Sequence, residues 1–96
     1  MEDKRLWLSN EFKTACVIYE LTEIRKGVAT LKTITPELTP YMGKSTVSRM
    51  LKWLEFWHIT RVTTKFKPGV LAREYGISNE DMPAISGMYE RYWKRV

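Results

Sequence analysis

The stretch GKSTVSRMLKWLEF, residues 43–56, supports two incompatible interpretations of the chain. Gly-Lys-Ser-Thr ends the loop that binds phosphates in nucleotide hydrolases, but the same letters can open a helix that is inserted into DNA. A phosphate-binding loop needs another glycine five residues before Gly43, after a buried strand. Leu38 stands at that position, in a segment with two prolines, TPELTPYM. The sequence therefore argues against a nucleotide-binding loop.

The same stretch has the pattern of a helix over about residues 44–57. Apolar or weakly polar residues recur at helical spacing and form an inward stripe of Val47, Met50, Leu51, Leu54 and His58. His58 lies just past the expected helix end, where a left-handed backbone is usual and histidine tolerates it better than most residues.

The other face of this helix is small, polar and basic. Its members are Lys44, Ser45, Thr46, Ser48, Arg49 and Lys52. Short hydroxyl side chains let a helix backbone approach base edges, and arginine can bind both acceptors of a guanine. The helix N-terminus itself attracts a phosphate. This face is therefore predicted to contact double-stranded DNA.

The charge distribution points to the same kind of partner. The net charge is +5, but residues 25–73 hold ten basic and two acidic side chains, whereas both ends of the chain are slightly acidic. A concentrated basic segment is typical of a protein that binds a polyanion. Four cations of the following segment suit phosphate contacts or minor-groove insertion: Arg61, Lys65, Lys67 and Arg73.

The rest of the chain predicts a single domain over residues 1–96. Ser9 can cap a helix over about 9–26, and Thr35 with Pro36 can open a helix over about 35–42. The β-branched segment VATLKTI, residues 28–34, could form a short edge strand. A hairpin is expected over about 59–77 with its turn at Pro68-Gly69, followed by a C-terminal helix over about 82–95.

The segment YMGKSTVSRMLKWLE, residues 41–55, resembles the turn and recognition helix of winged helix-turn-helix transcriptional regulators of the MarR and ArsR type. The resemblance covers about residues 34–78, and it departs from the family pattern at Tyr41, Pro40 and His58. It implies an α+β winged helix-turn-helix fold, mostly helical, with a two- to three-stranded antiparallel wing and a C-terminal helix. The recognition helix would enter the major groove, and the wing would touch the backbone or the adjacent minor groove.

The aromatic content predicts a homodimer. One small core cannot easily hide so many aromatic side chains, and a Tyr/Trp-rich helix end is a common dimer surface. The expected interface is Ile85, Met88, Tyr89, Tyr92 and Trp93, joined by the N-terminal segment around Leu6-Trp7-Leu8. The alternatives are a monomer whose last helix packs on its own first helix, and a platform on which single-stranded bases stack.

No residue pattern indicates catalysis. No nucleophile, base or carboxylate pair has suggestive spacing, and we expect no enzyme activity, cofactor, metal or small-molecule ligand. The single cysteine, Cys16, is expected to lie in the core, and the protein is expected to be cytoplasmic and to have no membrane segment. The sequence contains no Gln, and depletion of Gln and Asn is a feature of thermophilic proteins. Two functions fit: a small sequence-specific regulator that binds double-stranded DNA, or a winged-helix module that binds another protein.

Overall fold

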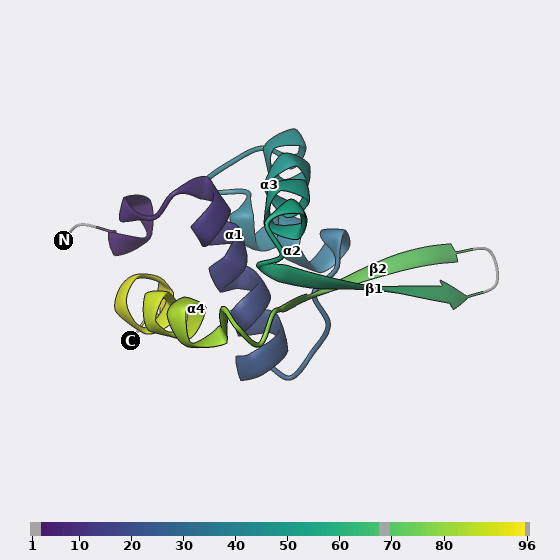
Figure 1. Cartoon of the computed structure of the whole chain (residues 1–96). Coiled ribbons are helices and arrows are strands. Elements are labelled where there is room, and N and C mark those ends of the chain that lie inside the picture. The colour runs from purple at the N-terminus through teal and green to yellow at the C-terminus, as the bar shows by residue number, and fades with distance from the viewer. Residues whose placement is uncertain (1–2, 68–69, 96) are drawn as a thin grey trace.

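The computed structural model describes residues 3–67 and 70–95. Helices surround one central helix, and a two-stranded hairpin extends away from them (Figure 1). The elements in chain order are η1 (Lys4–Trp7), α1 (Asn10–Tyr19), η2 (Glu20–Ile24), α2 (Leu31–Leu38), α3 (Lys44–Phe56), β1 (Thr60–Lys67), β2 (Val70–Ile77), α4 (Met82–Met88) and η3 (Tyr89–Trp93).

Helix α1 is the centre of the core. Ser9 caps it as predicted, since the Ser9 side chain accepts a hydrogen bond from the Phe12 backbone N–H at 3.3 Å. The middle of the helix is fully buried from Ala15 to Ile18, and α2, α3, α4 and β2 all pack against it. The helical path continues through the π-helical η2 and ends before Gly27, close to the predicted end of the first helix.

The prediction for the second helix was wrong in position. Helix α2 runs from Leu31 to Leu38 instead of over about 35–42, and it includes most of the segment expected as a strand. Thr30 caps it, and the side chains of Thr30 and Thr33 each accept a hydrogen bond from the backbone N–H of the other. This reciprocal cap outweighs the β-branched composition of the segment. Only Ala29 pairs with the hairpin, through a single bridge to Tyr75.

Helix α3 begins and ends close to the predicted residues. Gly43 is its N-cap, and Val47, Leu51 and Leu54 form its buried stripe. His58 has a φ of 59°, so the predicted left-handed helix end is confirmed. Its side chain is nevertheless exposed and does not extend the inward stripe, because the chain has already turned away from the helix axis.

The hairpin is antiparallel, with Thr60 opposite Ile77 at its base and Lys67 opposite Val70 at its far end. Thr60 and Ile77 are buried in the body of the protein, whereas Phe66 near the far end is 84% exposed. The distal half of the hairpin therefore projects into solvent (Figure 1). The predicted turn at Pro68-Gly69 lies outside the described residues.

The C-terminal helix packs on its own domain, which corrects the predicted dimer surface. Ile85, Tyr89 and Trp93 are 2%, 4% and 2% exposed, and α4 and η3 both contact α1. These three side chains are therefore part of the core and cannot meet a second copy. Met88 and Tyr92 are only partly buried against this core.

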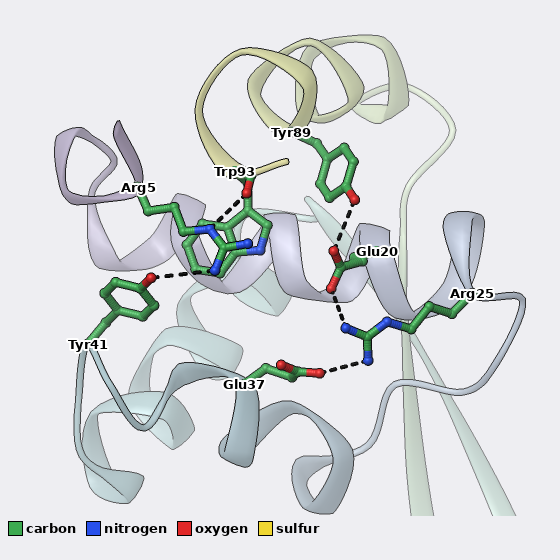
Figure 2. A network of polar contacts seen from close by, with 7 residues as sticks. All are labelled: Arg5, Glu20, Arg25, Glu37, Tyr41, Tyr89 and Trp93. Atoms are coloured by element: carbon green, nitrogen blue, oxygen red, sulfur yellow. Dashed lines mark hydrogen bonds and ion pairs between the residues drawn. The ribbon is translucent and has the colours of Figure 1, made fainter. Parts of the chain in front are cut away.

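Trp93 ties both ends of the chain to the turn before α3. The Arg5 guanidinium lies 4.2 Å from the centroid of the Trp93 ring, and its Nε donates to the Trp93 carbonyl at 2.7 Å (Figure 2). The Tyr41 ring lies 5.4 Å from the Trp93 ring, centroid to centroid. The Tyr41 ring therefore packs on part of the Trp93 side chain.

A polar network links the C-terminal helix to the helices beneath it (Figure 2). The Tyr89 hydroxyl donates to Glu20 at 3.0 Å, and Arg25 bridges Glu20 and Glu37 at 2.8 and 2.7 Å. Burial, with help from the hydrogen bond to Glu20, raises the pKa of Tyr89 to about 12. Tyr89 therefore stays a neutral donor to Glu20.

This arrangement of α2, a short turn, α3 and a hairpin on a helical core is a winged helix-turn-helix of the α+β class. The hairpin is the wing. Its two strands, with the single bridge from Ala29, agree with the predicted two- to three-stranded wing.

Candidate nucleic-acid interface

The polar face of α3 is open to solvent. Lys44, Ser45, Arg49 and Lys52 are exposed, and Thr46 is half-buried. The Arg49 Nη2 donates to the Thr46 Oγ1 at 3.3 Å, so the preceding turn of the helix restrains the guanidinium. Ser48 is also half-buried, on the side of α3 that faces α2. The structure thus brings together all six predicted residues of this helix on one accessible surface.

Two shallow grooves lie along the side of α3 that faces α2. One, of about 510 Å³, lies between α2, α3 and β2 and includes Lys32, Lys52 and Arg73 in its lining. The other, of about 590 Å³, lies between α2 and α3 and includes Lys32 and Lys44. Both grooves therefore combine lysine side chains with an otherwise largely apolar floor.

Lys32 is a member of this surface that the sequence analysis missed. The sequence pattern predicts a strand there, whereas Lys32 lies in the first turn of α2 and lines both grooves beside α3. The signal that could have placed it is the pair of threonines at 30 and 33, the spacing of a helix cap. A helix that starts after Thr30 places Lys32 on the side of α2 that faces α3.

The described cations of the wing differ in whether they form an ion pair with an acidic side chain. Arg61 is exposed, whereas the Lys65 Nζ lies 3.4 Å from a Glu74 oxygen. The Arg73 Nη2 contacts both carboxylate oxygens of Glu55 on α3, at 2.7 and 2.8 Å. This pair holds the wing against α3 and partly neutralises Arg73. The side chain of Lys67 lies outside the described residues.

The surface around α3 keeps an excess of positive charge. Within residues 3–67 and 70–95, five of its cations form no ion pair: Lys32, Lys44, Arg49, Lys52 and Arg61. Unpaired surface cations raise the local concentration of anions, and clustered ones do so most strongly. The surface is therefore suited to a partner with regularly spaced negative charges.

The described residues contain no group of three or more His, Cys, Asp and Glu side chains that could hold a metal ion. Burial raises the pKa of Cys16 to about 12, which keeps the thiol protonated and unreactive. Among the described helices, none has both the length and the apolar character needed to cross a bilayer.

Comparisons with known proteins give a likeness of fold. Neither a protein-family model nor a curated protein matches the chain. One similar solved structure is the crystal structure of Pex from Synechococcus sp. (strain PCC 7942) (Anacystis nidulans R2). It is 21% identical with a TM-score of 0.58, over 92% of this chain and 85% of the Pex chain. At this identity the likeness concerns the fold alone, and the protein has a winged-helix fold that it shares with Pex.

Proposed function

We propose that the protein binds double-stranded DNA in a sequence-specific manner and acts as a small transcriptional regulator. The observation that carries this proposal is the largely exposed polar face of α3, opposite its buried stripe, on a surface where five cations form no ion pair with any described residue. A helix with this division of faces packs on its own domain with one side and leaves the other for the major groove.

The residues divide into two kinds of contact. Arg49, held by Thr46 at 3.3 Å, is suited to bind a guanine through its O6 and N7 acceptors. Three further cations belong to the surface around α3: Lys32 on α2, Lys44 on α3 and Arg61 on β1. They are suited to contact the phosphates that border the major groove of DNA. The phosphate contacts would position the protein, and the contacts of α3 would select the sequence.

We also propose a homodimer, with a smaller interface than the sequence predicts because Ile85, Tyr89 and Trp93 lie in the core. Leu6 and Trp7 are exposed next to each other in the chain, and the Trp7 ring lies 6.3 Å from the ring of the half-buried Tyr92, centroid to centroid. This apolar patch lies on the terminal segments and leaves the face of α3 free. A two-fold dimer through it would present two copies of α3 to half-sites about 34 Å apart or a multiple of that spacing.

The second candidate function is a protein-binding module. Large apolar side chains are exposed on the protein, among them Trp57 at 58% and Phe66 at 84%, and such side chains are common anchors of protein interfaces. The unpaired cations around α3 favour DNA over this alternative, because most of them would have to lose water in an apolar protein interface.

The test of the proposed function is the binding of a labelled mixed-sequence DNA duplex as the salt concentration rises. If the five unpaired cations meet phosphates, log Kd should change with log salt with a slope of about 4 to 5, at about 0.9 for each contact. Binding at 50 mM salt that weakens steeply by 200 mM supports the proposal. No binding at 50 mM salt would end it and leave the protein-binding module.

Glu55→Gln is expected to strengthen DNA binding about threefold to tenfold at low salt, since it removes an anion beside α3 and releases Arg73 for a phosphate. The salt slope should also become steeper by about 1. The matched control is Glu90→Gln on η3, which breaks the exposed ion pair with Lys94 and should leave binding unchanged. Equal effects of the two substitutions would show that only net charge matters.

A further inference from the structure

Three aromatic side chains stand exposed at the C-terminal end of α3. Trp53, Phe56 and Trp57 are 38%, 72% and 58% exposed. They contact each other: the Trp53 and Trp57 rings are 6.1 Å apart between centroids, and the Phe56 and Trp57 rings meet edge to face at 5.2 Å. Exposed aromatic side chains in mutual contact usually mark a binding surface. The structure therefore raises the question of what covers them.

Phe56 lies in line with the polar face of α3. It follows Arg49 by seven residues and Lys52 by four, which are the spacings of residues on one side of a helix. Val47, Leu51 and Leu54 mark the opposite, buried side. Trp57 lies about 100° further around the helix from Phe56. Phe56 is thus the apolar continuation of the face that carries Arg49 and Lys52.

A shallow groove of about 860 Å³ beside Phe56 adds a further cation. Its lining includes Phe56, the exposed Arg61 of the wing and two acids, Glu55 and Glu80, so a further cation and a further acid both lie near the aromatic ring. Arg49 and Lys52 therefore share the helix face with Phe56, whereas Arg61 and Glu80 both line the groove beside it. The acid next to it in the chain, Glu55, is already paired with Arg73.

We propose that Phe56 contacts the 5-methyl group of a thymine at the end of the base sequence read by α3. This inference rests on the proposed function and assigns one element of its specificity. Thymine is the base of DNA that presents a methyl group in the major groove, and phenylalanine is among the side chains that contact it. Burial of one methyl group against the ring corresponds to about a fourfold difference in affinity.

The position of Phe56 favours DNA over a second protein surface. A partner protein that covered Phe56 from this side would also cover Arg49 and Lys52, and it would have to remove water from two unpaired cations. DNA instead supplies phosphates and base acceptors for these cations and a methyl group for the ring. A single DNA duplex could therefore contact Arg49, Lys52 and Phe56 at the same time.

The test uses the tightest duplex selected from a random DNA pool, with each thymine replaced in turn by uracil, which lacks only the methyl group. At one position, uracil should weaken binding of the parent protein about fourfold. Phe56→Ala should bind the thymine and uracil duplexes equally at that position. Trp57→Ala is the control, because Trp57 is exposed in the same cluster but off this line, and it should keep the fourfold preference.

The outcomes separate the inference from the proposed function. Phe56 is 72% exposed, so Phe56→Ala should fold normally, and circular dichroism checks this. If the parent protein binds DNA but is indifferent to every thymine methyl, or if Phe56→Ala keeps the preference, the inference is wrong and the proposed function stands. A change in molecular mass on Phe56→Ala with the preference intact would assign the ring to a second copy. Absence of any DNA binding by the parent protein would reject both.

Discussion

Trp93→Ala is expected to lower the free energy of unfolding by about 3–5 kcal/mol, the usual effect of removing a buried tryptophan. Trp93 is 2% exposed, the Tyr41 ring packs against it, and the Arg5 guanidinium lies over it at 4.2 Å. The substitution would leave a cavity where the N-terminal segment, the C-terminal helix and the turn before α3 meet. Urea unfolding followed by circular dichroism measures the change.

Trp57→Ala is the matched control for this substitution, since Trp57 is 58% exposed and its loss should cost less than about 1 kcal/mol. The comparison decides what the aromatic C-terminal helix does. If Trp93→Ala left the stability unchanged but reduced the molecular mass in solution, Trp93 would belong to a dimer interface after all. A large loss of stability at unchanged mass agrees with its position in the core.

Arg49→Ala is expected to weaken binding to the preferred DNA by about 1–3 kcal/mol and to relax the preference at one base pair. Arg49 is exposed on α3, and its Nη2 donates to the Thr46 Oγ1 at 3.3 Å, which places the guanidinium over the polar face of the helix. The measurement is the affinity of parent and variant for the preferred duplex, for its single-base variants and for random DNA.

Lys32→Ala is the control for the Arg49 experiment. Lys32 lies on α2 in the grooves beside α3, where a phosphate contact is expected. Its loss should weaken binding to all sequences alike and reduce the salt slope by about 1. If Arg49→Ala also weakened preferred and random DNA equally, Arg49 would be a phosphate contact and would carry no sequence information.

The sequence predicted α3 and the hairpin well because their patterns are local. The stripe of Val47, Leu51 and Leu54 has the helical period, and two β-rich segments stand on either side of the dipeptide Pro-Gly in the sequence, a pattern typical of a hairpin. Even the left-handed backbone at His58 follows from its place just after a helix end. These features depend on neighbours in the chain, so a single sequence contains them.

Two predictions were wrong: the start of the second helix, which depends on competition between two possible caps, and the partner of the last helix, which depends on tertiary packing. Two possible helix starts, Thr30 and Thr35, compete within one short segment, and the reciprocal cap of Thr30 and Thr33 decides for the first. The periodicity of the last helix correctly identified Ile85, Tyr89 and Trp93 as one face. It could not say whether α1 or a second copy covers that face, since both partners offer the same apolar surface.

In the candidate site, too, the sequence predicts what local helix geometry determines and misses what tertiary packing determines. All six polar residues predicted on α3 lie on one accessible face, because helix geometry alone places them there. Lys32 was missed together with its helix. The pair of Arg73 with Glu55 joins residues 18 positions apart on different elements, and charge counting along the chain treated both as independent. Only the packing of the wing on α3 reveals that Arg73 already has a partner.

The most direct test of the central claim is selection of bound sequences from a random pool of DNA duplexes, with the parent protein and with Arg49→Ala. If α3 reads the major groove, the parent protein should enrich one motif, and Arg49→Ala should lose the preference at one position within it. An inverted repeat with half-sites one helical turn apart, or a multiple of it, would add the two-fold dimer. No enrichment by the parent protein at low salt, or the same motif unchanged with Arg49→Ala, would contradict the assignment of α3 and Arg49 to sequence recognition.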